Sequence, residues 1–296
     1  MESPSPRPRD PMETMDRNRA LLARGTGYVY KEVAGHELAA WVFTPEGHQP
    51  SARRPAILFF FSSAWDSGLL SQFAPHCLHF ADRGMVAATV EYRTASQHQA
   101  GPLDAMSDAR SAVRWIRRHA AELGVDPEKI AGGGGSAGAH AILTAAMIRD
   151  KELDAPSDPS DQSCVPDALV LFDPVVALTP GGKFGAEKFP SAKAARQASP
   201  IHRVRKKLPP MILFHGTHDR LLPFSATRSF AKKMRRWYRR NDCRLVPFEG
   251  CGHSFFNFNV DPRFFEATIN QADSFLVEKG FLPPISEKEA ENRLAY

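Results

Sequence analysis

A serine flanked by glycines is the first group in this chain that could do chemistry. Gly134, Ser136 and Gly138 form a Gly-x-Ser-x-Gly pattern within Ile-Ala-Gly-Gly-Gly-Gly-Ser-Ala-Gly-Ala-His (130–140). A short apolar run precedes the pattern and an Ala-rich run follows it, which predicts a strand, a tight turn and a helix. In such a turn the serine hydroxyl stands at a helix N-terminus, where backbone N–H groups favour developing negative charge. The spacing therefore predicts a nucleophilic serine, provided that a base lies nearby.

Glycine-rich turns also serve other purposes. They occur as ordinary strand-to-helix connections and as phosphate cradles. A phosphate loop of the Walker type requires a Lys directly after its last glycine, and this chain has Ala139 at that position. Whether Ser136 is a nucleophile therefore depends on whether the rest of the chain supplies a base for the serine and an acid for the base.

A carboxylate and a histidine follow later predicted strands. The run 211–214 leads into His-Gly-Thr-His-Asp-Arg-Leu-Leu-Pro (215–223), which places Asp219 just past the strand. The run 244–247 leads into a glycine-flanked loop that contains His253. A serine hydroxyl is a weak nucleophile until a base accepts its proton, and the base needs a carboxylate to fix its tautomer. We therefore predict that Ser136 attacks, His253 moves the proton and Asp219 orients the imidazole.

Each of these roles has a rival. Asp173 also ends a predicted strand, and some hydrolases take their acid from the strand after the serine turn, but Asp219 is favoured because it opens the next helix. The remaining rivals are interpreted as residues without a catalytic role, because they lie too close to Asp219, inside the helix, or without a separate base: His215, His218, His140 and Cys251.

The elements that must position these groups alternate along the chain. Short buried strands between helical segments predict a mostly parallel sheet with helices on both faces, preceded by an antiparallel hairpin at 28–33 and 37–43. We expect further strands at 55–61, 85–91, 168–172, 211–214 and 244–247, and helices at 72–84, 104–123, 225–240 and 262–279. The stripe of Phe230, Met234 and Trp237 predicts that the basic stretch 232–240 is a solvated helix face and not a nucleic-acid site.

Composition bounds the class of protein. The 296 residues carry a net charge of +5 and four cysteines without Cys-x-x-Cys spacing, so neither a zinc site nor a disulfide framework is indicated. We expect a Pro-rich disordered tail at 1–18, one domain at 19–283 and a C-terminal tail at 284–296, with no metal and no cofactor. No membrane span or signal peptide is recognisable, so a cytoplasmic protein is expected, or a secreted one if a leader has been removed.

These motifs together resemble those of serine esterases of the α/β-hydrolase superfamily. They are Gly-Gly-Ser-Ala-Gly (134–138), Phe-His-Gly-Thr-His-Asp-Arg-Leu-Leu-Pro-Phe (214–224), Glu-Gly-Cys-Gly-His-Ser-Phe-Phe (249–256), Glu-Tyr-Arg (91–93) and Asp-Ala-Arg-Ser-Ala-Val-Arg-Trp-Ile-Arg (108–117). The resemblance covers roughly residues 25–280 and is to acetyl esterases, acetylxylan esterases and lipase-like enzymes near the hormone-sensitive-lipase group. It implies the α/β-hydrolase fold, for which the order Ser136, Asp219, His253 is expected.

One loop departs from the family pattern. The family has His-Gly-Gly-Gly and an aromatic residue after the strand that corresponds to 56–61, whereas this chain has Phe-Ser-Ser-Ala-Trp (61–65). That loop donates backbone N–H groups to the oxyanion together with the residue after the serine. The resemblance thus implies Ser63, Ala64 and Ala137 as donors. Glycine tolerates a positive φ better than Ser or Ala, so we expect impaired donation, unless the hydroxyls of Ser62 and Ser63 replace a donor.

The sequence therefore predicts hydrolysis of a carboxylic ester through an acyl-enzyme. By resemblance, the substrate is a small-molecule short-chain acyl ester or an acetylated carbohydrate. One alternative is an exopeptidase or amidase on the same fold. The other is a catalytically weak, hydrolase-like binding protein, which the altered loop makes credible. No pattern in the chain indicates an oligomeric state.

Overall fold

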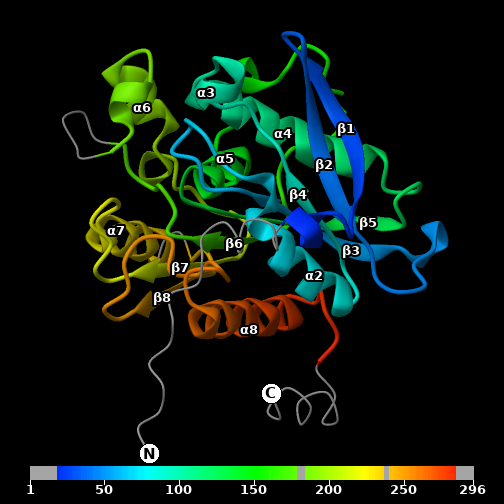
Figure 1. Cartoon of the computed structure of the whole chain (residues 1–296). Coiled ribbons are helices and arrows are strands. Elements are labelled where there is room, and N and C mark those ends of the chain that lie inside the picture. Colours follow the sequence, from blue (N-terminus) through cyan, green and yellow to red (C-terminus); the bar gives the residue numbers. More distant parts are fainter. Residues whose placement is uncertain (1–18, 160, 179–183, 237–239, 285–296) are drawn as a thin grey trace, which may run out of the picture.

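The computed structural model describes residues 19–159, 161–178, 184–236 and 240–284, whose arrangement is shown in Figure 1. The described residues form an eight-stranded sheet in the order β1-β2-β4-β3-β5-β6-β7-β8. Its strands are β1 (Thr26–Val33), β2 (His36–Phe43), β3 (Arg54–Phe60), β4 (Val86–Val90), β5 (Val125–Gly135), β6 (Ala168–Phe172), β7 (Met211–Gly216) and β8 (Cys243–Phe248).

Pairing directions follow from the connections. β1 and β2 form an antiparallel hairpin, and β2 is antiparallel to β4. Ala34 and Gly35 between β1 and β2 both have positive φ, as a two-residue hairpin turn of type I′ requires. The pairs from β4 to β8 are parallel, so their carboxyl ends share one edge. The predicted mostly parallel sheet with an antiparallel hairpin is confirmed.

Helices cover the sheet on both sides. They are α2 (Ala74–Asp82), α3 (Ala95–His98), α4 (Pro102–Arg118), α5 (Ser136–Met147), α6 (Ala192–Ala198), α7 (Phe224–Arg235) and α8 (Pro262–Glu278). Figure 1 shows α2 and α8 on one face and α4 and α5 on the other. Every residue of β4 and β6 is buried, which explains their unbroken apolar runs.

Several predicted boundaries are wrong. The helix expected from Gln72 begins as a 3₁₀ turn, η2 (Leu70–Phe73), and continues as α2, where Pro75 occupies the first helical turn. α4 begins two residues earlier than expected, because Pro102 suits the first turn and the Asp104 carboxylate accepts a hydrogen bond from the N–H of Gly101. α4 ends at Arg118 and α7 ends at Arg235, and both fall short of the helical periodicity in the sequence.

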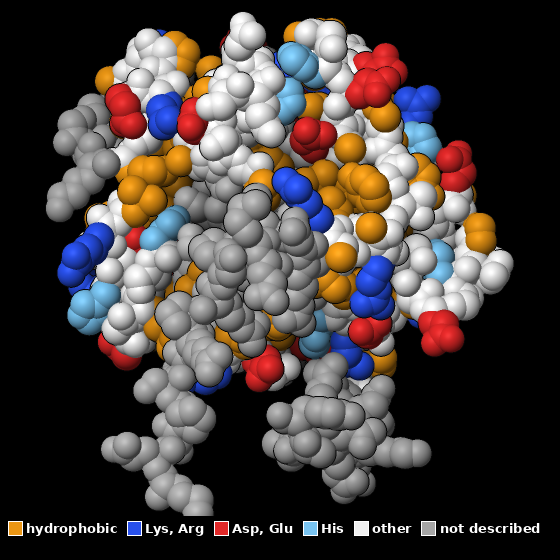
Figure 2. Space-filling view, viewed as in Figure 1, with side chains coloured by type: hydrophobic (Ala, Val, Ile, Leu, Met, Phe, Trp, Pro, Cys, Tyr) orange, Lys and Arg blue, Asp and Glu red, His pale blue; other side chains and the backbone are white. Residues whose placement is uncertain are grey.

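The remaining expectations have mixed outcomes. All four cysteines are free and buried. Phe230 and Met234 are buried as predicted, whereas Trp237 lies outside the described residues. The same is true of the predicted tail at 1–18 and of 285–296. On the face seen in Figure 2, Lys and Arg side chains are interspersed with Asp and Glu. No helix among the described residues is long and apolar enough to cross a membrane.

Candidate active site

Ser136 lies at the turn between β5 and α5, at the carboxyl edge of the sheet. Its φ is +51°, an unfavourable value for a residue with a side chain, as a strained serine turn requires. A Cβ added at Gly138 would collide with the carbonyl oxygens of Phe60 and Phe61, and one at Gly134 would approach the Phe60 oxygen to 2.6 Å. The two glycines therefore let α5 pack directly against the end of β3, and the predicted turn is confirmed.

The structure brings together the three residues that the sequence predicts. Nε2 of His253 lies 3.2 Å from Oγ of Ser136, and Nδ1 of His253 lies 2.7 Å from Oδ2 of Asp219. These residues follow β5, β7 and β8, and 117 positions separate Ser136 from His253. Because Asp219 is a hydrogen-bond acceptor, Nδ1 of His253 carries the proton and Nε2 is left to accept one from Ser136.

Asp219 is held as an anion. Its Oδ1 accepts hydrogen bonds of 2.8 Å from the N–H groups of Leu221 and Leu222. Burial by itself would raise the pKa of this carboxyl, but hydrogen bonds with His215 and His253 hold the pKa well below its usual range. A carboxyl whose pKa is depressed in this way is suited to stabilise a positive charge on His253.

The rival acid, Asp173, holds backbone instead. It is fully buried, and its two oxygens accept hydrogen bonds from the N–H groups of Gly216 (3.1 Å) and Ser254 (2.8 Å). Burial raises the pKa of Asp173 to about 6, although His215 and His253 oppose the rise. Its nearer oxygen is 3.9 Å from Nδ1 of His253, beyond hydrogen-bond distance.

The other rivals lie apart from the serine. His215 is buried behind Asp219, with Nε2 donating to the carbonyl of Leu222 (3.0 Å) and Nδ1 2.9 Å from the hydroxyl of Thr227. Burial lowers its pKa, but the interactions with Asp219, Asp173 and the Leu222 carbonyl together outweigh burial and leave the pKa raised. His218 is exposed, and His140 is buried in α5 with Nε2 3.0 Å from the Ala198 carbonyl.

The loop 61–65 lies beside the serine turn, since β3 pairs with β5. Ala64 and Trp65 have φ values of +51° and +58°, so this loop adopts left-handed backbone without glycine. Among the described residues, the N–H groups of Ser63 and Ala64 have no hydrogen-bond partner, whereas the N–H of Ser62 donates to Oε1 of Gln72 (2.6 Å). Ala137 lies in the first turn of α5, where backbone N–H groups have no partner within the helix. Three backbone donors are therefore available to a ligand: Ala137, which directly follows Ser136, and Ser63 and Ala64, which follow the neighbouring strand β3.

A chain of hydrogen bonds holds this loop. Tyr92 donates to the carbonyl of Phe61 (2.7 Å), so its oxygen, 2.6 Å from Oγ of Ser63, accepts the Ser63 proton. Oγ of Ser63 in turn accepts from the N–H of Trp65 (2.9 Å). The expectation that the Ser63 hydroxyl replaces an oxyanion donor is therefore wrong, because its proton is already used. Tyr92 belongs to the Glu-Tyr-Arg motif, but the sequence carried no signal for its contact with Ser63.

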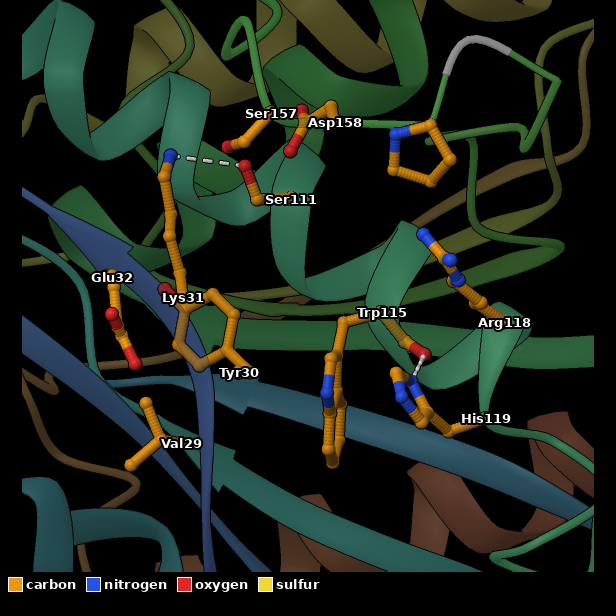
Figure 3. A pocket seen from close by; sticks show the side chains of 11 residues that line it. Val29, Tyr30, Lys31, Glu32, Ser111, Trp115, Arg118, His119, Ser157 and Asp158 are labelled. Atoms are coloured by element: carbon orange, nitrogen blue, oxygen red, sulfur yellow. Dashed lines mark hydrogen bonds between the residues drawn. The ribbon is translucent and has the colours of Figure 1, made fainter.

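Two other features could hold a ligand. Asp173, His215 and Asp219 have ligand atoms within 4.8 Å of one another, and each of these side chains also makes the hydrogen bonds described above. A cavity of about 400 Å³ lies between β1, α4 and residues 157–159 (Figure 3). Within its lining, Lys31 is bonded to Ser111 and to Asp108, and Ser136 does not line the cavity.

The family model described as BD-FAE matches residues 42–234, which is more than half of the chain. The chain belongs to the BD-FAE family. The matched range contains Ser136, Asp219 and the loop 61–65, but ends before His253. The BD-FAE match therefore covers the serine turn and the acid, while the histidine loop rests on the geometry above.

Curated relatives of this BD-FAE chain are esterases by name. Esterase LipC of Mycobacterium tuberculosis is 26% identical over 230 residues, 70% of this chain and 54% of LipC. A probable isoprenylcysteine alpha-carbonyl methylesterase of Arabidopsis thaliana is 27% identical over 220 residues, 68% of this chain and 45% of that protein. The chain thus spans about half the length of the curated relatives it matches.

Solved structures match over nearly their full length. Thermogutta terrifontis esterase 2 phosphorylated by paraoxon is 44% identical with a TM-score of 0.83, covering 89% of this chain and 97% of that chain. The propionate-bound form of the same esterase is 42% identical with a TM-score of 0.84, covering 90% and 98%. The α/β-hydrolase fold and the resemblance to serine esterases near the hormone-sensitive-lipase group are therefore confirmed.

Proposed function

We propose that this protein hydrolyses carboxylic esters through an acyl-enzyme on Ser136. The observation that carries the proposal is the continuous hydrogen-bonded line from Ser136 through His253 to Asp219, with distances of 3.2 and 2.7 Å. That line gives the serine hydroxyl a base in the correct tautomer and gives the base a counter-charge. The esterase names of the relatives and of the matching solved structures support the same reaction class.

The steps follow from these atoms. Oγ of Ser136 attacks the ester carbonyl carbon as its proton moves to Nε2 of His253, and the carbonyl π electrons become an oxyanion. The N–H groups of Ser63, Ala64 and Ala137 donate to that oxygen. Collapse of the tetrahedral species expels the alcohol, which takes the proton from His253. Water then attacks the acyl-serine by the same route, which releases the acid and restores the Ser136 hydroxyl.

We further propose short-chain acyl esters as the substrate class. The matching Thermogutta esterase has been solved with propionate and with butyrate bound, two short carboxylates of the size expected for the released acid. An acetylated carbohydrate belongs to the same class by its acyl group. The unpaired N–H groups of Ser63 and Ala64 argue against the binding-protein alternative, because a protein that only binds needs no oxyanion donors.

A fluorophosphonate probe tests the proposal. The probe should label Ser136, as shown by peptide mapping, and the protein should hydrolyse p-nitrophenyl acetate and butyrate faster than the octanoate ester. Ser136→Ala should remove both labelling and turnover while leaving the melting temperature unchanged, because Ala fits where Ser does. Turnover that survives in Ser136→Ala, or a folded wild type that is neither labelled nor active, would contradict the proposed mechanism.

A further inference from the structure

Two loops from distant strands flank Ser136 and are bridged by one side chain. The oxyanion loop (61–65) follows β3 and the histidine loop (249–257) follows β8, while β5, β6 and β7 lie between these strands in the sheet. Gln72, in the short turn η2 (Leu70–Phe73), contacts both. Its Oε1 accepts from the N–H of Ser62 (2.6 Å), and its Nε2 donates to Oγ of Ser62 (3.2 Å) and to Oδ1 of Asn257 (2.7 Å).

Asn257 carries the connection on to the histidine. Its Nδ2 donates to the carbonyl of Ser254 (3.0 Å), the residue directly after His253. A backbone group at each end fixes the orientation of both amides, since Ser62 supplies an N–H and Ser254 supplies a carbonyl. Gln72 must therefore present its NH₂ group to Asn257, and the polarity of the bridge leaves no alternative orientation.

The bridge acts on the two groups that the reaction needs in register. Gln72 holds the N–H of Ser62, which sets the backbone that leads into the donors Ser63 and Ala64. Asn257 donates a hydrogen bond to the carbonyl of Ser254, while Asp173 accepts one from the N–H of the same residue (2.8 Å). Asp173 ties the histidine loop to the central strands, and the Gln72–Asn257 hydrogen bond extends that tie to the oxyanion loop.

We propose that Gln72 is a positioning residue that keeps the oxyanion loop and His253 in a fixed relative position through Asn257. This inference rests on the proposed function. Proton transfer and oxyanion donation must be aligned on one tetrahedral carbon, and a misplacement of about 1 Å costs up to about 10²-fold in rate. Gln72 does not contact the reacting atoms, so its loss should lower kcat and leave ground-state binding of a small ester intact.

A double-mutant cycle on hydrolysis of p-nitrophenyl acetate tests this role. Gln72→Met keeps the length of the side chain without its polar atoms, and Asn257→Leu removes the other half of the bridge. We expect each single variant to lower kcat about 10- to 100-fold with KM nearly unchanged. The kcat of the double variant should be no lower than that of the less active single variant. Losses that multiply in the double variant, or a kcat equal to that of wild type, would overturn the proposal.

Asn241 supplies the matched control. It is also a buried amide with a backbone group at each end, accepting from the N–H of Leu208 (3.1 Å) and donating to the carbonyl of Arg205 (2.7 Å), but it bonds to neither loop. Asn241→Leu should lower the melting temperature and leave kcat within about twofold, because Asn241 stabilises the fold without contacting either loop beside Ser136. If kcat in all three single variants simply follows the melting temperature, the role of Gln72 is structural and the proposal fails.

A second variant keeps the test decisive if Gln72→Met folds poorly. Gln72→Glu retains the acceptor for Ser62 but presents a carboxylate to Oδ1 of Asn257, and it can donate there only when protonated. The ratio of kcat in Gln72→Glu to kcat in Asn257→Leu should therefore rise as the pH falls from 8 to 5, and a flat ratio would overturn the bridge. A wild type that is not labelled at Ser136 would overturn the proposed function as well, whereas normal labelling with unaffected Gln72 variants would overturn this inference alone.

Discussion

Asp173 approaches His253 without bonding to it: its nearer carboxylate oxygen lies 3.9 Å from Nδ1, against 2.7 Å for Asp219. Two carboxylates therefore face one imidazole, and their environments separate their roles. Burial raises the pKa of Asp173 to about 6, while hydrogen bonds with His215 and His253 overcome the effect of burial and depress the pKa of Asp219. The carboxylate with the depressed pKa is the one within hydrogen-bond distance of His253, and the other holds the backbone of Ser254 and Gly216.

Substitution of the two acids should rank them. Asp219→Asn should lower kcat by about 10⁴-fold, because the amide favours the wrong tautomer of His253. Asp173→Asn should cost far less, since an Asn oxygen can still accept one of the two backbone hydrogen bonds. Steady-state kinetics on p-nitrophenyl acetate, with melting temperatures for both variants, provide the comparison. The reverse ranking would transfer the orienting role to Asp173.

The oxyanion loop should depend on the Ser63 hydroxyl and tolerate glycine at Ala64. Ser63→Ala removes the hydrogen bonds to Tyr92 and from the N–H of Trp65, so the donors lose their anchor and kcat should fall about tenfold, less than the 10²–10³ of a deleted donor. Ala64 already has a φ of +51°, so Ala64→Gly relieves strain and should leave kcat unchanged or slightly raised.

Measurements of kcat and KM on one acetyl ester decide this point. A large gain in kcat for Ala64→Gly would show that the loop is impaired as the sequence pattern suggested. An unchanged kcat in Ser63→Ala would show that the chain through Tyr92 does not hold the donors.

His76 should make the protein sensitive to acid. It is fully buried in α2, both ring nitrogens lack hydrogen-bond partners among the described residues, and the side chains of Phe59, Phe73, Phe172 and Phe265 surround it. Burial lowers the pKa of His76 from 6.5 to about 3, and the nearby His79 adds to the shift. Below pH 6.5, His76 therefore binds a proton in the unfolded chain but stays neutral in the folded protein until the pH approaches 3.

The sign of the effect follows from this linkage. Above pH 6.5 the protonation of His76 does not change the free energy of unfolding. As the pH falls from 6.5 towards 3 the free energy of unfolding decreases, by about 3 kcal/mol at pH 4. His76→Met removes this term, so the difference in unfolding free energy between the variant and wild type should widen by that amount between pH 7 and pH 4. Urea unfolding at pH 7, 5.5 and 4 measures it. Both proteins contain Asp173, so its opposite contribution cancels in the difference between them. A difference in unfolding free energy that stays the same from pH 7 to pH 4 would refute the prediction.

Much of the site was predictable because its signals are local. The glycines around Ser136 are dictated by the close approach of α5 to β3. The apolar run before Asp219 is the fully buried strand β7, whereas the run before His253 is β8, a half-buried strand at the edge of the sheet. A parallel sheet brings the carboxyl ends of such strands to one edge, so the meeting of the three groups could be expected from their order. Helix ends were less predictable, because the periodicity of α4 and α7 continues past the residues where each helix stops.

Other features depend on distances between residues far apart in the sequence, which no local pattern encodes. Both Asp173 and Asp219 follow strands, and their roles differ because one lies 1.2 Å nearer to Nδ1 of His253. The loss of glycine from the loop 61–65 predicted impaired donation, yet Tyr92 lies 29 positions away and holds Ser63 in place. Gln72 and Asn257 are separated by 185 positions and meet only because β3 and β8 end at the same edge of one sheet. Sequence thus determined which chemical groups reach that edge, while tertiary packing decided which of them are within hydrogen-bond distance, since such bonds form only within about 3.2 Å.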